Sequence, residues 1–195
     1  MRDLPITGFL DQLAARVPAP GGGATAALHA AQAAALLGMV ARYSDGPKYT
    51  EHAATIDRIR DEADAIREQA VALIEADVEA FGEVAAAYRL PKQTDQQRAD
   101  RSAALAAATA RAAEPPAAVL TAAGRLVELA EQLLPVGNPN VVTDVAAAAE
   151  AARAAATTAR LNLEVNRASV QDGEVEAVIA RADRVTAAVR ATIAG

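Results

Sequence analysis

The chain has 195 residues, a formal net charge of −6 and no cysteine. Its acidic balance and an aromatic content of 3% are unlike the basic, aromatic-bearing surfaces that bind nucleic acids. Disulfides, thiol nucleophiles and sulfur-ligated zinc are excluded, and two histidines are too few for an all-histidine metal site, so we expect no metal. The alanine-rich composition favours helices throughout, which predicts a single all-α domain over residues 1–195.

The first predicted helix covers residues 7–16 and ends before a proline-containing break. Gly21, Gly22 and Gly23 then open an alanine-rich helix over residues 23–44. Bare N–H groups at a helix start can bind an anion, although a simple helix-start turn explains the same glycines. The segment follows no strand and lacks a GK[ST] ending, so neither a P-loop nor a dinucleotide fingerprint applies. Its small side chains predict a thin helix that neighbours approach closely.

No charged residue lies between Arg16 and Arg42, and about 20 apolar residues suffice to cross a bilayer. Alanine dominates this stretch and contributes little transfer free energy compared with leucine or phenylalanine. The first residues also lack the basic-then-apolar layout of a signal peptide. We therefore expect a buried bundle helix in a cytoplasmic protein that makes no membrane contact.

A turn at residues 44–50 precedes a segment that runs to residue 88 with Gly82 as its one breaker. Apolar residues recur there at alternating steps of three and four, which predicts a long helix with one buried seam. The seam residues are Ile56, Ile59, Ala63, Ile66, Ala70, Leu73, Ala80, Val84 and Ala87.

By the same period position 77 belongs to the seam, but its residue is Asp77. A buried carboxylate costs desolvation energy unless it is paired, and burial raises its pKa toward neutrality. Such a carboxyl is a candidate general acid or base. The structural alternative is an ion pair between Asp77 and an arginine across the bundle, or a position at the frayed edge of the seam.

Proline, glycine and asparagine divide the rest of the chain. We expect further helices over residues 95–113, 115–134 and 144–167, followed by a terminal helix after the turn at 169–174. The sequence therefore predicts an all-α bundle of six to seven helices, two of them long.

Asn162 and Asn166 interrupt the alanine seam of the last long helix. Residues at i and i+4 project from one helix face. Buried asparagines can fix the register between helices, as they do in coiled coils. Alternatively, the pair lines a polar cavity and offers a ligand both hydrogen-bond donors and acceptors.

Four segments of the chain match the motifs of a known family: FLDQLAARVPAPGGGATAAL, ADVEAFGEVAAAYRLPK, GNPNVVTD and NLEVN. In this order, and over about residues 9–167, they resemble the C-terminal domain of formiminotransferase-cyclodeaminase, a family with free-standing bacterial cyclodeaminases and methenyltetrahydrofolate cyclohydrolases. The resemblance implies an all-helical homodimer that binds a tetrahydrofolate substrate near the subunit interface and requires neither a metal nor a redox cofactor.

The resemblance also implies the site residues. Catalytic roles fall to Asp77, Lys92 and Asp144. Substrate contacts fall to Gly21, Gly22, Gly23, Phe81, Asn138, Asn162 and Asn166. The chain departs from the family pattern at Ala24 and Thr143, where serine is common, and the first departure removes a hydroxyl that could cap the helix or touch ligand.

Two reactions fit this resemblance. We expect hydrolysis of 5,10-methenyltetrahydrofolate to 10-formyltetrahydrofolate. The alternative is a formiminotetrahydrofolate cyclodeaminase, which releases ammonia and forms 5,10-methenyltetrahydrofolate. A third possibility is a non-catalytic folate-binding or assembly protein. An enzyme predicts that Asp77, Lys92 and Asp144 converge within one ligand's width, whereas a non-catalytic protein predicts that Asp77 faces solvent or forms a structural ion pair.

Overall fold

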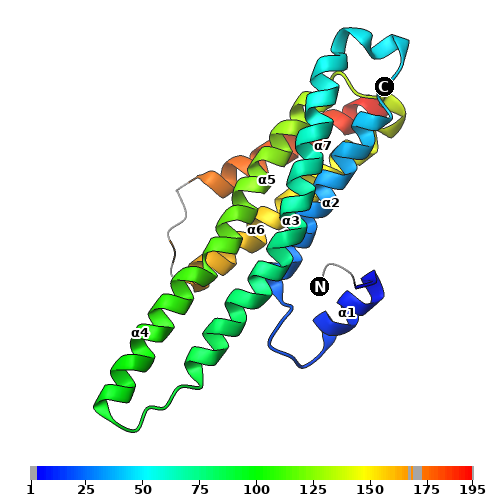
Figure 1. The fold of residues 1–195 in the computed structure, drawn as a ribbon. Helices are drawn as coiled ribbons and strands as arrows, with labels where there is room; N and C mark the ends of the chain where they lie inside the picture. Colours follow the sequence, from blue (N-terminus) through cyan, green and yellow to red (C-terminus); the bar gives the residue numbers. More distant parts are fainter. Residues whose placement is uncertain (1–3, 167, 169–172, 195) are drawn as a thin grey trace.

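The computed structural model describes residues 4–166, 168 and 173–194, and within these residues the chain is helical without strands (Figure 1). The α-helices are α1 (Ile6–Ala14), α2 (Gly22–Arg42), α3 (Ala53–Tyr88), α4 (Asp95–Ala112), α5 (Glu114–Leu133), α6 (Val142–Val165) and α7 (Glu174–Ala194). Two short 3₁₀ turns cover Pro47–His52 and Pro139–Val141. The expected all-α bundle is confirmed. The expected turn at 169–174 lies mostly outside the described residues.

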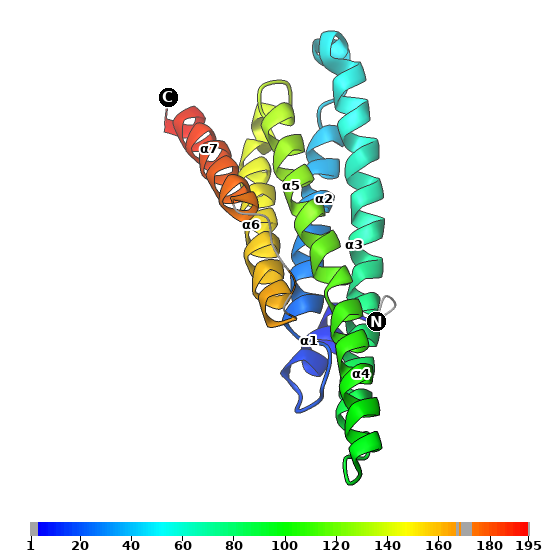
Figure 2. The ribbon, with the colours of Figure 1, turned by 90° about the vertical axis from the view of Figure 1, so that its left-hand side faces the viewer.

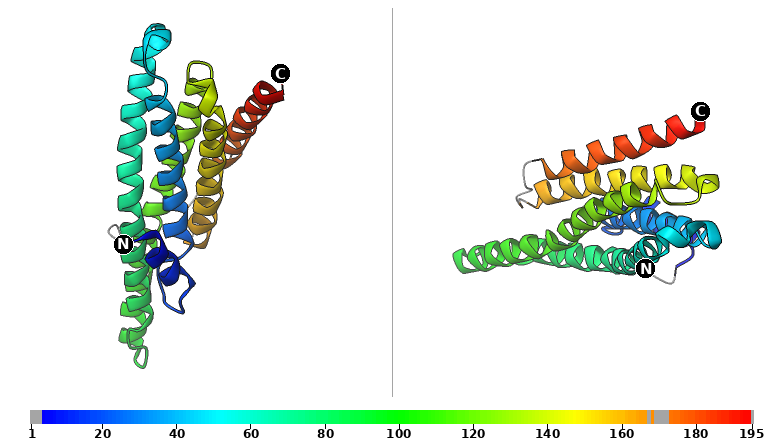
Figure 3. Two further views of the ribbon diagram at one scale, coloured as in Figure 1. Left: turned by 90° about the vertical axis from the view of Figure 1, so that its right-hand side faces the viewer. Right: turned by 90° about the horizontal axis from the view of Figure 1, so that it is seen from above.

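Helix α2 forms the centre of the bundle and packs against α3, α5 and α6, while α7 covers α5 and α6 from outside (Figures 2 and 3). Its alanines leave room for these neighbours, and Ala26, Ala27 and Ala30 are fully buried. By length and hydropathy α2 is the one described helix that could span a membrane, yet 61% of that segment is buried in the bundle. This burial is typical of a core helix.

The predicted seam of α3 is present, with one change of register. Ile56, Ile59, Ala63, Ile66, Ala70 and Ala87 are buried as expected, but Ile74 replaces Leu73 as the buried residue of its turn. A step of three from Ile74 keeps Asp77 on the same face. Beyond Asp77, Ala80 and Val84 are only partly buried, because α2 begins at Gly22 and does not cover this end of α3.

The second half of α3 and all of α4 form a hairpin that extends past the end of α2 (Figures 1 and 2). A capping box starts α4: the Gln97 N–H donates to Thr94 Oγ1 at 3.2 Å, and the Thr94 N–H donates to Gln97 Oε1 at 3.3 Å. Because the hairpin extends past the N-terminus of α2, α2 does not cover the side of the hairpin that faces α6, and a cavity can form there.

Candidate functional site

The N-terminus of α2 is capped by a residue from another helix. Gly21 occupies the capping position and has no side chain to donate or accept. The backbone N–H of Ala24 instead donates a hydrogen bond to the Asp77 carboxyl group of α3. Asp77 therefore takes the place that serine or aspartate usually holds at a helix start, and the partial positive charge of the helix end lies beside its carboxylate.

Gly23 makes this contact possible. A Cβ atom at Gly23 would lie 1.9 Å from Asp77 Oδ1 and 2.5 Å from Asp77 Cγ, far inside van der Waals contact. A Cβ atom at Gly21 would meet nothing within 4 Å. The glycine run therefore has one position at which the missing side chain is a steric requirement, and the group that requires the space is the predicted catalytic carboxyl.

Burial sets the proton affinity of Asp77. Desolvation raises the pKa of its carboxyl above the ordinary value, and the hydrogen bond from Ala24 opposes this rise without cancelling it. Within the described part of the chain no salt bridge involves Asp77, so the structural ion pair expected of a non-catalytic protein is not seen. A partly buried carboxyl with a raised pKa can both accept and donate a proton.

The two asparagines of α6 lie on the other side of the α2 start. A Cβ atom at Gly22 would lie 3.8 Å from Asn162 Nδ2, which donates to Thr158 O at 2.9 Å. Asn166 Nδ2 donates to Ala112 O at 2.9 Å and so connects the end of α6 to the end of α4. Asn166 thus connects two helices, whereas the Asn162 bond stays within α6. The Oδ1 atoms of both accept no hydrogen bond from the described residues.

Lys92 and Asp144 do not meet Asp77 within one chain. Lys92 is exposed in the loop after Tyr88, and Tyr88 itself lies about 16 Å along α3 from Asp77 at 1.5 Å per residue. Asp144 lies in the first turn of α6, about 27 Å along that helix from Asn162. The convergence expected of the three catalytic candidates is therefore not seen within one chain.

Asn138 also lies at the far end of the bundle, where its polar atoms hold two loops together. Its backbone N–H donates to Ser44 Oγ at 2.8 Å, and its Nδ2 donates to Tyr43 O at 2.7 Å. Its Oδ1 accepts from the Asn140 N–H at 3.0 Å. In this structure Asn138 clamps the loop before α6 to the C-terminus of α2.

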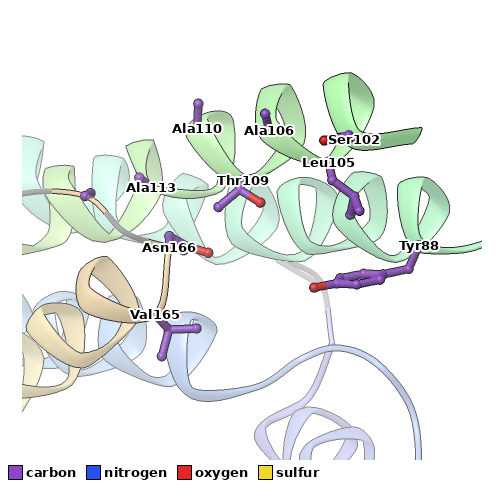
Figure 4. Close-up of a pocket in the computed structure, with 10 residues that line it drawn as sticks. Tyr88, Ser102, Leu105, Ala106, Thr109, Ala110, Ala113, Val165 and Asn166 are labelled. Atoms are coloured by element: carbon purple, nitrogen blue, oxygen red, sulfur yellow. The ribbon is translucent and has the colours of Figure 1, made fainter. Parts of the chain in front are cut away.

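Sequence reasoning missed a cavity of about 830 Å³ between α4 and the ends of α3 and α6 (Figure 4). Its walls include Tyr88 of α3, Leu105 and Thr109 of α4, and Val165 and Asn166 at the end of α6. Of these residues the sequence singles out Asn166, for which a polar cavity is one of two alternatives; the others come from three helices and share no local motif. Helical spacing could have indicated Tyr88 as a site residue, because it follows Asp77 by eleven residues, or three turns, and lies on the same face of α3.

No group of three or more metal-ligating side chains occurs among the residues that the structure describes. The chemistry available at the α2 start is therefore that of one carboxyl, two amides and the N–H groups of a helix end.

Comparison with known proteins gives a consistent assignment. The formiminotransferase-cyclodeaminase family model matches residues 5–184. The methenyltetrahydrofolate cyclohydrolase of Methylorubrum extorquens is 38% identical over 168 residues, which cover 86% of this chain and 81% of that protein. The mouse formimidoyltransferase-cyclodeaminase is 31% identical over 171 residues, but this match spans only 32% of the mouse protein.

The solved structure of formiminotetrahydrofolate cyclodeaminase from Thermotoga maritima superimposes with a TM-score of 0.79 and 27% sequence identity. The superposition covers 97% of this chain and 96% of that one, so the two folds correspond from end to end. The chain belongs to the formiminotransferase-cyclodeaminase family.

Proposed function

We propose that the protein is a folate one-carbon enzyme that hydrolyses 5,10-methenyltetrahydrofolate to 10-formyltetrahydrofolate. The observation that carries the proposal is the Asp77 carboxyl, which is held at the start of α2 by Gly23 and has a pKa raised by burial. The 38% identity with a methenyltetrahydrofolate cyclohydrolase over most of both chains supports the choice of reaction.

In this reaction a water oxygen attacks the methenyl carbon, which carries positive charge shared between N5 and N10. Asp77 accepts a proton from that water as the tetrahedral carbon forms. The carboxylic acid then protonates N5 while the carbon–N5 bond breaks, and the remaining hydroxyl becomes the formyl oxygen with release of its proton. An ionised Asp77 also stabilises the cationic methenyl group electrostatically before attack.

Asn162 and Asn166 have the geometry to orient the substrate. Their Oδ1 atoms can accept hydrogen bonds from pterin N–H groups or from the attacking water, because each Nδ2 already donates to a backbone carbonyl, that of Thr158 or that of Ala112. An amide fixed in this way loses little further conformational entropy when substrate binds.

A homodimer is part of the proposal. Lys92 and Asp144 lie away from Asp77 in a single chain, and a second copy is the simplest source of both at the same substrate. Large apolar side chains of α1 and of the C-terminal part of α6 are solvent-exposed in one chain, including Ile6 and Val165 at 80% each and Leu161 at 61%. Leu161 and Val165 lie one turn apart on α6, and an exposed apolar pair of this kind favours a protein–protein interface.

The proposed chemistry transfers protons and involves no net oxidation or reduction, so it needs no redox cofactor, and Asp77 takes the acid–base role without a metal. The proposed setting is the cytoplasm, with no membrane or nucleic-acid partner, because the one long apolar helix is mostly buried and the chain is acidic.

The second candidate reaction is the cyclodeamination of 5-formiminotetrahydrofolate. It is favoured by the end-to-end structural correspondence with the Thermotoga maritima cyclodeaminase. Here N10 attacks the protonated formimino group and gives its own proton to Asp77. Asp77 passes this proton to the departing nitrogen, so that ammonia leaves and the 5,10-methenyl cation remains. Both reactions pass through a tetrahedral carbon between two nitrogens, so a single carboxyl can serve either one.

The test is the loss of 5,10-methenyltetrahydrofolate absorbance with purified protein and with the Asp77→Asn variant. We expect rapid decay with the wild type and a kcat/KM about 10²- to 10⁴-fold lower for the variant, the usual contribution of a general acid–base group. Decay at the buffer rate would reject the cyclohydrolase, and ammonia release from 5-formiminotetrahydrofolate would then establish the second candidate. Failure of both assays would favour a non-catalytic folate-binding protein.

A further inference from the structure

The face of α3 that carries Asp77 continues past the N-terminus of α2, where α2 no longer covers it and two aromatic side chains are exposed. Phe81, Val84 and Tyr88 follow Asp77 at steps of four, three and four, so all four side chains share one helix face. Phe81 is 46% exposed and Tyr88 is 62% exposed. The whole chain has only two phenylalanines and three tyrosines, so two exposed aromatic rings on one face are a concentrated feature.

The cavity beside this face of α3 suits a flat, uncharged group. Tyr88 contributes an aromatic ring, Leu105 and Val165 contribute apolar walls, and Thr109 and Asn166 contribute polar atoms. Among the described residues none of its lining side chains is charged. In Figure 4 the Tyr88 hydroxyl points along the cavity toward Asn166. A group with an aromatic ring and a neutral hydrogen-bonding substituent matches these walls.

The cavity begins close to the α2 start. Asn162 lies beside Gly22, and Asn166, one helical turn further along α6, lines the cavity and is bonded to the end of α4. One turn corresponds to about 5.4 Å along the helix axis. In a folate, N10 joins the reacting carbon directly to the p-aminobenzoyl ring. A one-carbon unit bound between Asp77 and Asn162 therefore places that ring within about one helical turn of Asn166, at the mouth of the cavity.

We propose that the cavity between α4 and the end of α6 binds the p-aminobenzoyl ring of the folate substrate, an assignment that rests on the proposed function. The ring packs against Val165 at the mouth, its carboxamide bonds to Thr109 or Asn166, and Tyr88 lies further along the cavity. The glutamate that follows leaves toward Arg101, whose guanidinium lies 5.5 Å from the centre of the Tyr88 ring and donates to Tyr88 O. A cation at this end suits the glutamate carboxylates.

The test fills the cavity without touching the catalytic carboxyl. Ala106 of α4 is exposed and lines the cavity, whereas Ala107 is equally exposed, follows it directly and does not line the cavity. We expect Ala106→Trp to raise KM for the active folate at least about tenfold with kcat within about threefold, the pattern of lost binding rather than lost chemistry. Ala107→Trp should leave both parameters near wild type, and circular dichroism should show equal helix content.

A second readout does not depend on turnover. p-Aminobenzoylglutamate, titrated calorimetrically, should bind the wild type and Ala107→Trp but not Ala106→Trp. If the wild type turns over folate and Ala106→Trp has an unchanged KM, the cavity assignment is overturned while the proposed function stands. If neither folate is turned over, the proposed function fails, and calorimetry alone decides: selective loss of binding in Ala106→Trp supports the cavity, and absence of binding to the wild type rejects it.

Discussion

The two ends of α2 are both held by polar groups from other segments, but the two arrangements differ in how completely they are satisfied. At the C-terminal end, Ser44 Oγ donates to Val40 O at 2.7 Å and accepts the Asn138 N–H at 2.8 Å. The Asn138 side chain also donates to Tyr43 O and accepts the Asn140 N–H. We call this group of contacts around Ser44 and Asn138 the C-terminal clamp. At the N-terminal end, burial dominates the electrostatics of Asp77, and the Ala24 N–H only partly offsets it.

A fully satisfied buried network stabilises a fold, whereas an under-satisfied buried carboxyl costs stability. Local violations of this kind tend to mark functional sites, where the cost is offset elsewhere in the structure. The contrast between the two ends of α2 therefore supports the proposal that the N-terminal carboxyl is the chemical group and that the C-terminal clamp is structural. The predictions below test that distinction.

The largest effect is expected from Gly23→Ala. The added Cβ atom would occupy the space of the Asp77 carboxyl group, so the side chain must move away from the α2 start. We expect kcat/KM to fall at least about a hundredfold, approaching the loss caused by Asp77→Asn. Gly124→Ala in α5, outside the candidate site, is the matched control, because its Cβ atom would meet its nearest neighbour, Val178, at an ordinary 3.8 Å. Equal activity of the two alanine variants would show that the close approach at Gly23 has no catalytic importance.

A mixing experiment tests whether the two ends of the bundle meet in a dimer. Asp77→Asn and Asp144→Asn should each be inactive as homodimers. If each site takes Asp77 from one copy and Asp144 from the other, a mixed dimer contains one intact site. Random re-association then restores about a quarter of the wild-type activity, because half of the dimers are mixed and each has one of two sites. No recovery after verified subunit exchange would place Asp144 outside the shared site.

A smaller effect, confined to stability, is expected at the opposite end of α2. Ser44→Ala removes the hydroxyl that accepts the Asn138 N–H and leaves that partly buried donor without this partner. We expect the free energy of unfolding to fall by about 1–3 kcal/mol, the usual cost of an unsatisfied buried group, with kcat retained. Urea denaturation followed by circular dichroism measures the first quantity. A large loss of kcat at unchanged stability would contradict the structural assignment of the clamp.

Much of this fold could be predicted from the sequence, because the periodic spacing that indicates a helix is a local property of the chain. The apolar seam of α3 and its polar interruption at Asp77 can be predicted from residue spacing alone. The shift of the buried position from Leu73 to Ile74 depends on how neighbouring helices pack on α3, which residue spacing does not reveal. The contact between Gly23 and Asp77 joins residues more than fifty positions apart, so no local pattern predicts it. Likewise the separation of Asp144 from Asp77 depends on the direction in which α6 crosses the bundle, which becomes known only from the structure.

The smallest effect concerns pH. The folded state raises the pKa of Asp77 above its ordinary value of 3.8, so the folded protein holds this proton more tightly than the unfolded chain. Stability must then fall as pH rises from about 3.8 to the raised pKa, and stay level above it. Asp77→Asn removes this dependence while its Oδ1 can still accept the Ala24 N–H. The melting temperature of the variant relative to wild type should therefore increase between pH 4 and pH 7. A difference that is constant over this range, or that decreases, would mean that burial does not raise the pKa of Asp77, and the N-terminal end of α2 would then resemble the satisfied clamp at the other end.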